Sequence, residues 1–433
     1  MGHLVNADRE YRLLQRRLDD SVMGAPDSPA FTKILQILFA PEEARLARRI
    51  PFRPTPLDEL SVKLGLPEDE LADKVAELAQ RGVLIDLEYR GRRYAALPPV
   101  VIGFYEFVFM RVRQDLPQAE LARLFDQYTR GDDRFVKGLF QGSTQAARTM
   151  VHEESLPDGA AEVFDWERVS RVIETASAIG VSLCVCRHTA SHLGRACQRP
   201  QRSCLSFNYA AQAMLRSGNA EPLTAAEAKR LVEQCKQAGM AQIGENVQRN
   251  VAFVCNCCAC CCGMFEAVKD FNIRHAIMTS NWICQIDAAA CKGCGACAKA
   301  CPVDAIAMVD RDPAQKRKTA VCHEELCLGC GVCHGACRSG AIRMNRREQR
   351  VFTPETVFDR LVLMAIERGK LAELIFDAPE KLSHRALARV LHLLERASLV
   401  KAAMAISPLR SAFLNRLLRE AKRSAGEVGE IMG

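Results

Sequence analysis

The feature that most constrains this chain is a cysteine motif, C-x2-C-x2-C-x3-C, that occurs twice in close succession. The first copy comprises Cys291, Cys294, Cys297 and Cys301, and the second comprises Cys327, Cys330, Cys333 and Cys337. Three thiolates at this spacing on a tight loop can each bind a different iron of one cubic cluster, and the fourth cysteine can then reach a neighbouring cluster. Zinc sites instead use two separated cysteine pairs around one ion. The spacing therefore favours iron–sulfur clusters over zinc.

This duplicated motif resembles that of the bacterial two-cluster ferredoxins. Gly293, Gly295, Gly329 and Gly331 fit the resemblance, because a backbone that wraps a cluster needs positive φ angles and close approach. The resemblance implies two [4Fe–4S] clusters that exchange their fourth ligands: Cys291, Cys294, Cys297 and Cys337 for one, and Cys327, Cys330, Cys333 and Cys301 for the other. Arg338 stands where the family usually has proline, which changes the turn but not the ligand.

A second group of ten cysteines lies upstream in two blocks. Its members are Cys184, Cys186, Cys197 and Cys204, followed by Cys255, Cys257, Cys258, Cys260, Cys261 and Cys262. Adjacent cysteines point their thiols in different directions, so one loop can serve two metal centres or opposite sides of a larger one. Ten thiolates suffice for two four-thiolate clusters with two to spare, or for one cluster and a site with an open coordination position. The sequence leaves both arrangements open.

The density of these cysteines favours metal over the alternatives. Closely spaced thiols are readily oxidised unless they are ligated, which argues against a run of incidental buried thiols, and a zinc knot is the other alternative. His188 and His192 are candidate ligands, although such histidines more often donate hydrogen bonds to cluster sulfur or lie exposed. We expect one or two further iron–sulfur clusters within residues 184–262.

Length and cysteine placement indicate several domains and a reducing compartment. A chain of 433 residues is too long for one core, and 48% apolar residues allow sizeable cores. All 21 cysteines lie between Cys184 and Cys337, whereas a disulfide framework would be spread along the fold. The polar N-terminus shows no secretory signal, and the longest apolar run, residues 97–110, is too short to span a bilayer. We therefore expect a cytoplasmic protein without a transmembrane segment.

The N-terminal third shows a recognisable order of elements. Residues 57–64 and 68–80 are periodic segments that end at Gly65 and Gly82, and residues 83–89 and 93–97 read as two strands joined by a short turn. Helix, turn, helix and hairpin in this order resemble a winged helix. Residues 100–150 look helical, with a break at residues 131–133 and aromatic side chains that we interpret as core.

Charge argues against a nucleic-acid partner for this module. A winged helix would place residues 68–80 in the major groove, but this segment carries five carboxylates against one lysine, and phosphate would repel it. The formal charge of +7 is itself weak evidence, because two thiolate-bound [4Fe–4S] clusters would lower it to roughly +3. We therefore expect a docking or structural role for this module.

The segments around and after the duplicated motif also show a pattern. Cys284 and Cys322 precede the two copies at similar distances, each on a predicted strand, residues 282–286 and 319–323; we interpret both as structural thiols. Residues 306–309 and 342–344 would close the two repeats as partner strands, with residues 310–318 as the exposed link.

Amphipathic helices are predicted after residue 350, at residues 353–368, 384–396 and 411–423, and the first would be capped by Thr353 with Pro354 at its first position. A basic face at residues 410–423 allows peripheral membrane contact, but a solvated face is the commoner explanation.

Together these features predict an α+β, multidomain chain. Its parts would be a winged-helix-like and helical module (1–150), a cysteine-rich iron–sulfur domain (151–283), a dicluster ferredoxin-like module (284–349) and a helical tail (350–433). The combination resembles a group of iron–sulfur proteins of anaerobic bacteria and archaea that are described only as ferredoxin-like. The resemblance covers roughly residues 50 to 345 and implies redox clusters that serve an oxidoreductase system.

The resulting functional hypothesis is an electron-transfer protein that carries single electrons between partner oxidoreductases. The sequence shows no nucleotide-binding fingerprint and no nucleophile triad, so an electron-carrying subunit is favoured over a stand-alone enzyme. One alternative is an iron–sulfur, redox-sensing regulator whose winged module binds DNA. Another is a reductase with an open iron in the middle domain. The partners would be redox proteins, an oxidoreductase complex in particular.

Overall fold

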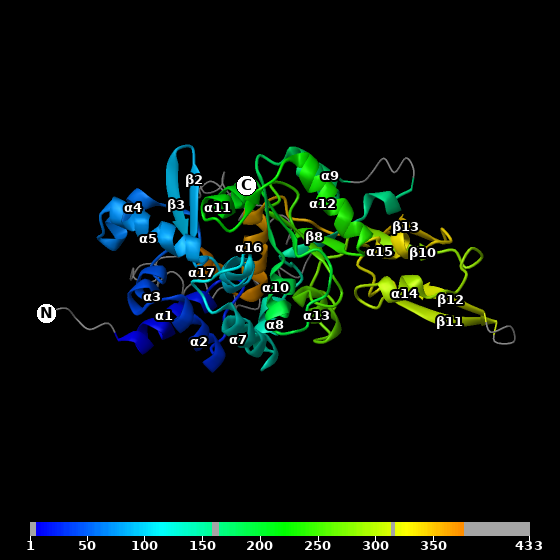
Figure 1. The fold of residues 1–433 in the computed structure, drawn as a ribbon, viewed down its shortest axis with the longest axis horizontal. Coiled ribbons are helices and arrows are strands. Elements are labelled where there is room, and N and C mark those ends of the chain that lie inside the picture. Colours follow the sequence, from blue (N-terminus) through cyan, green and yellow to red (C-terminus); the bar gives the residue numbers. More distant parts are fainter. Residues whose placement is uncertain (1–5, 158–163, 313–316, 376–433) are drawn as a thin grey trace, which may run out of the picture. The chain divides into compact units, whose positions relative to one another are not determined.

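A computed structural model describes residues 6–157, 164–312 and 317–375 of the chain (Figure 1). The described residues form two compact units. The first unit contains the residues up to Thr144, the segment Gln212–Asn219 and the residues from Glu355 onward; the second contains Gln145–Ala211 and Ala220–Pro354. Helices and strands are mixed, as the α+β prediction requires. Both cysteine-rich regions lie in the second unit.

The first unit is built from helices and one small sheet. Its helices are α1 (Ala7–Asp19), α2 (Pro29–Leu38), α3 (Pro41–Ala47), α4 (Leu57–Leu64), α5 (Glu68–Arg81), α6 (Tyr105–Phe109), α7 (Gln118–Arg130), α8 (Arg134–Leu139), α16 (Val357–Arg368) and α17 (Leu371–Ile375), with an irregular turn at Val100–Phe104. Phe31 of α2 and Tyr128 of α7 stack with ring centroids 4.7 Å apart, so aromatic residues do form its core, as predicted.

The order helix, turn, helix and hairpin is present in residues 55–96. Gly65 and Gly82 end α4 and α5 in left-handed conformations, with φ of 70° and 87°. Strands β1 (Thr55–Pro56), β2 (Ile85–Tyr89) and β3 (Arg92–Ala96) form an antiparallel sheet in the order β1-β3-β2. The hairpin turns at Arg90 and Gly91, both with positive φ, which suits a two-residue connection.

Two predictions for this unit and its neighbouring segments are wrong in detail. Residues 147–150, expected to be helical, form strand β4, whereas the break at residues 131–133 is confirmed. The helix expected from residue 353 begins at Val357, because Thr356 and Asp359 exchange side-chain and backbone hydrogen bonds in a capping box. Thr353 instead accepts a hydrogen bond from Arg148. The helices predicted at residues 384–396 and 411–423 lie outside the described residues.

The second unit is organised around a six-stranded antiparallel sheet in the order β4-β8-β9-β6-β5-β7. The strands are β4 (Ala147–Met150), β5 (Ile179–Leu183), β6 (Arg202–Phe207), β7 (Glu221–Pro222), β8 (Ala241–Glu245) and β9 (Phe253–Cys257). The accompanying helices are α9 (Val169–Thr175), α10 (Val185–His192), α12 (Ala225–Gln237) and α13 (Gly263–Lys269), with single turns at Glu153–Ser155 and Asp165–Glu167. Helix α11 (Asn208–Arg216) begins in this unit, and its residues from Gln212 onward belong to the first. Thr224 caps α12, as predicted.

A buried ion pair joins this sheet to the segment that follows it. Arg148 on β4 donates to Glu167 at 2.9 Å, and neither side chain is exposed to solvent. The same carboxylate oxygen accepts from the backbone and side-chain nitrogens of Asn281, each at 3.0 Å. Asn281 directly precedes the first strand of the duplicated-motif region, so the pair helps to fix where that region begins.

The duplicated-motif region contains two antiparallel strand pairs and two short helices. Strand β10 (Trp282–Ile286) pairs with β13 (Ile342–Arg346), and β11 (Ile306–Asp312) pairs with β12 (Arg317–Cys322). Helices α14 (Ala296–Ala300) and α15 (Val332–Ala336) follow the two cysteine loops. The prediction that each repeat closes on its own partner strand is therefore wrong. The short link after Asp312 makes β12 the nearest antiparallel partner of β11, and β10 is left to pair with β13.

No helix within the ranges that the structure describes has both the length and the apolar character needed to cross a bilayer.

Candidate metal centres

The first motif region surrounds a cavity with four cysteines. Cys291, Cys294 and Cys297 come from the loop before and the first turn of α14, and Cys337 comes from the end of α15. Ala341 and Ile342 also line this cavity. The structure therefore brings together the first set of four cysteines that the ferredoxin resemblance implies.

A second cavity is lined by the complementary set. Cys327, Cys330 and Cys333 lie on the second loop and α15, and Cys301 comes from the end of α14. The backbone N–H of Ala305 donates to the Cys301 sulfur at 3.2 Å. Each cavity therefore takes three cysteines from one motif copy and one from the other.

The donor atoms and the backbone both suit an iron–sulfur cluster. Each cavity offers four thiols, and backbone N–H groups point at sulfur in both. Burial raises the pKa of Cys337, but hydrogen bonds from Ser339 and the backbone of Ala341 outweigh it and hold that pKa below its ordinary value. Groups that stabilise a thiolate in this way also stabilise thiolate ligation of iron.

Two glycines hold the cysteine loops tightly against neighbouring strands. Gly293 has a φ of +66°, and a Cβ atom there would lie 2.2 Å from the carbonyl oxygen of Lys318. Gly329 has a φ of +74°, and a Cβ atom there would lie 2.1 Å from the carbonyl oxygen of Trp282. Gly295 has the same φ as Gly329, but a Cβ atom there would meet nothing within 4 Å. The first two glycines are therefore required by close approach as well as by conformation.

Cys284 and Cys322 lie beside the second cavity. The Cys284 thiol hydrogen-bonds those of Cys322 and Cys333, and Cys284 is buried and lines the cavity. Hydrogen bonds from Cys284 and Cys327 lower the pKa of Cys322 to about 4. Their parallel placement was visible in the sequence, but their closeness to the second set of ligands was not, because it depends on the exchanged strand pairing.

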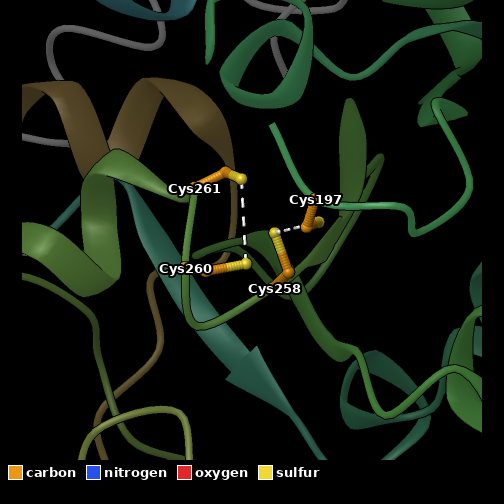
Figure 2. A group of neighbouring side chains, drawn as sticks. All are labelled: Cys197, Cys258, Cys260 and Cys261. Carbon is orange, nitrogen blue, oxygen red and sulfur yellow. Dashed lines mark hydrogen bonds between the residues drawn. The ribbon is translucent and has the colours of Figure 1, made fainter. Parts of the chain in front are cut away.

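A third group of four cysteines gathers in the middle region (Figure 2). Cys258, Cys260 and Cys261 come from the loop between β9 and α13, and Cys197 comes from the loop between α10 and β6. The four sulfur atoms lie within 4.8 Å of one another. Burial raises the pKa of Cys197, but the backbone N–H of Arg199 and neighbouring thiols outweigh it and lower that pKa to about 7. We call these residues the four-cysteine group.

The remaining six cysteines of the middle region also come together. A continuous series of thiol hydrogen bonds runs through them in the order Cys204, Cys255, Cys257, Cys262, Cys186 and Cys184. Cys257 and Cys262 are buried, and the other four are half-buried. We call these residues the six-cysteine group. The sequence predicted all ten cysteines as ligands but not this division.

Arg187 lies between the two groups and is fully buried. Its Nη1 donates to the Cys258 sulfur at 3.5 Å and to the Asn256 carbonyl oxygen at 3.2 Å, and its Nη2 donates to the Ser203 hydroxyl. Burial disfavours its charge, but Cys184 and Cys258 outweigh burial and raise the pKa of Arg187. No role for Arg187 was predicted from the sequence, although an arginine directly after a C-x-C pair was a visible signal.

The other polar candidates lie outside the four-cysteine group. The rings of His188 and His192 lie 4.9 Å apart on α10, and neither belongs to the cluster of four sulfur atoms. Cys235 on α12 is fully buried, and burial raises its pKa to about 12, which is typical of an unreactive core thiol.

Comparisons with known proteins agree with the geometry of the duplicated motif. A family model described as a 4Fe-4S dicluster domain matches residues 290–341, which include all but the edges of both cavities. No curated protein and no solved structure matches the chain. The matched domain and the gathered cysteines make this an iron–sulfur protein with a ferredoxin-like role in electron transfer.

Proposed function

We propose that this protein carries single electrons between partner oxidoreductases in the cytoplasm, in anaerobic metabolism, through two [4Fe–4S] clusters in residues 284–349. The observation that carries the proposal is the exchange of fourth cysteines between the two cavities. Cys301 belongs to the first motif copy but lines the second cavity. Cys337 belongs to the second motif copy but lines the first cavity. Two clusters held in this way are neighbours, joined by short covalent paths.

The residues around the cavities have a distinct part in this function. A [4Fe–4S] cluster supplies one-electron redox chemistry, and its potential depends on hydrogen bonds to sulfur and on burial. Here the Ala305 N–H and the groups around Cys337 would stabilise the added negative charge. Cys330 and Cys333 are buried whereas Cys294 is exposed, so the first cluster would be the one that exchanges electrons with a partner.

The middle region would extend this path. We propose that the four-cysteine group holds a further iron–sulfur cluster, because its four gathered thiols match in number the one thiolate that each iron of a cube requires. Arg187 and Arg199 would neutralise part of its negative charge, since both guanidinium groups donate to sulfur of this group.

The winged-helix-like module would dock a protein partner. The exposed face of α5 carries Glu70, Asp73 and Glu77, which phosphate would repel. Two of the three arginines of the hairpin are already engaged by carboxylates, because Arg92 binds Asp58 at 2.8 Å and Arg93 binds Asp86 at 2.9 Å. These contacts favour the carrier over the DNA-binding regulator.

Reduction of the native protein under strictly anaerobic conditions tests the carrier. We expect two one-electron couples whose EPR signals interact, and rapid oxidation by an added one-electron acceptor such as cytochrome c. Cys294→Ser should slow the second-order oxidation several-fold, whereas Cys235→Ser, which changes a core thiol, should not. Salt-sensitive, sequence-selective DNA binding by the holo protein in a gel shift would instead support the regulator.

A further inference from the structure

The six-cysteine group is a second gathering of thiols in the middle region, and it contains more thiols than the four-cysteine group. Cys204 and Cys255 are direct partners across β6 and β9, and Cys257 is two residues further along β9. Cross-strand partners and residues two apart lie on the same face of a sheet. Three of the six thiols therefore belong to one sheet face.

The other three thiols come from the beginnings of two helices. Cys184 is the N-cap of α10 and Cys186 lies in its first turn, while Cys262 is the N-cap of α13. Cys262 accepts hydrogen bonds from the thiols of both Cys186 and Cys257, which joins this set to the sheet set. The group therefore divides into three thiols from strands and three from helix beginnings.

Electrostatics favours an anionic occupant at this group. The backbone N–H of Phe265 donates to Cys262, and that of Gly263 to Cys186. Arg187, fully buried, faces the group through its interactions with Cys184 and Cys257. Within the described residues, the main interactions of these thiols are with one another, with backbone N–H groups and with Arg187, so sulfur dominates the donor set. Such a soft donor set with adjacent positive groups suits an iron–sulfur centre.

The number of thiols distinguishes two kinds of iron–sulfur centre. A single cube uses four thiolates and would leave two of these six without a role. Two four-iron units that share a bridging sulfide need only three protein thiolates each, because the bridge replaces the fourth. The three-plus-three division matches this second arrangement.

We propose that the six-cysteine group binds one iron–sulfur cluster of about eight irons, built as two bridged four-iron units, each held by three thiolates. This inference rests on the proposed function, since it takes the chain to be an electron carrier, and it adds a centre able to store more than one electron. Such a centre would let a carrier of single electrons collect them for a two-electron partner.

The test uses six single variants of the full-length protein, Cys184→Ser, Cys186→Ser, Cys204→Ser, Cys255→Ser, Cys257→Ser and Cys262→Ser, purified anaerobically. Mössbauer spectra, iron and acid-labile sulfide are measured for each. Cys235→Ser is the matched control, because this buried thiol lies outside both groups. We expect all six variants to alter one common Mössbauer component, which comprises about eight irons, and the control to leave it unchanged.

If two of the six variants leave the Mössbauer spectrum unchanged and the common component comprises about four irons, the group holds a single cube and the inference is overturned. Zinc in place of that component would overturn it as well. The EPR signals of the duplicated-motif clusters are read on the same samples. If these signals are absent from the wild-type protein, the proposed function fails; if they are present while the common component is absent, only this inference fails. If a variant does not fold, the Mössbauer spectrum of the wild-type protein decides instead. That spectrum either contains the component of about eight irons, which supports the inference, or lacks it, which overturns the inference.

Discussion

Replacing Arg187 should lower the reduction potential of the centre in the four-cysteine group. Arg187 is the fully buried cation next to this group, and its Nη1 donates to the Cys258 sulfur at 3.5 Å. Reduction adds negative charge to the centre, and a nearby positive charge favours that step. In Arg187→Gln the charge and the strongest N–H donors are lost, so reduction becomes harder and the potential becomes more negative.

The size of this shift follows from Coulomb's law. Two unit charges 3.5 Å apart interact with about 5 kcal/mol at an effective dielectric constant of about 20. The added electron spreads over a whole cluster, so about a third of this value, or ~1.5 kcal/mol, is a reasonable expectation. For a one-electron couple this corresponds to a shift of roughly 60 mV toward negative potential.

Potentiometric EPR titration of the native protein and three variants measures the shift. Arg187→Lys keeps the charge and should shift the potential by less than half as much as Arg187→Gln. Arg199→Gln is the matched comparison, because the Arg199 guanidinium also donates to sulfur, 3.7 Å from Cys260. Arg199 is only half-buried, so solvent screening should reduce the shift in potential to about 20 mV or less. An unchanged or more positive potential in Arg187→Gln, with iron content retained, would refute the reasoning.

Three further predictions concern the cavities and the scaffold. Gly329→Ala should cost the second cavity its cluster, a loss of about four irons, because the new Cβ atom would lie 2.1 Å from the Trp282 oxygen. Gly295→Ala has the same φ and open space, so it should keep its iron and lose only about 1 kcal/mol of stability. Cys284→Ser and Cys322→Ser should keep the full iron content, whereas Cys301→Ser should lose about four irons. Glu167→Gln should lower the free energy of unfolding by about 3–5 kcal/mol, because it leaves the Arg148 charge buried and unpaired, and chemical denaturation measures this.

Each of these predictions has its own contradicting outcome. Equal iron loss in Gly329→Ala and Gly295→Ala would show that the positive φ angle, and not the close approach to Trp282, causes the loss of the cluster. Iron loss in Cys284→Ser would make that residue a ligand. In the double variant Arg148→Met/Glu167→Gln, the removed charge should restore part of the stability, and no restoration would mean that the ion pair is not the source of the effect.

The duplicated motif could be predicted well because its spacing and its chemistry point the same way. Three cysteines three residues apart, with glycines between them, allow few backbone paths around a cluster, and the structure places the two expected sets around two cavities. The capped helix after Thr224 and the break at residues 131–133 were likewise determined by local signals.

The strand pairing could not be predicted in this way, whereas the helix start near residue 353 was mispredicted although the sequence holds a signal for it. Strand β10 pairs with β13 across a long stretch of sequence, and no local pattern distinguishes this partner from β11. At the helix start, residues 353 and 356 are both threonines, and only Thr356 has an acidic residue three positions later to complete a capping box.

The division of ten cysteines into a group of four and a group of six also depended on tertiary structure. Cys257 and Cys258 are adjacent in sequence, yet the first belongs to the six-cysteine group and the second to the four-cysteine group. Side chains alternate between the two faces of strand β9, which places Cys255 and Cys257 together in the six-cysteine group. Cys197 joins the four-cysteine group only because the loop between α10 and β6 approaches from elsewhere in the chain.

The most direct test of the account is an anaerobic potentiometric EPR titration of the native protein, with iron, zinc and acid-labile sulfide counted on the same sample. We expect about eight irons from the duplicated-motif clusters, whose low-potential signals interact, together with further irons and sulfide from the middle region. Zinc in place of iron, or iron that cannot be reduced to a paramagnetic state, would contradict the claim that this protein carries electrons.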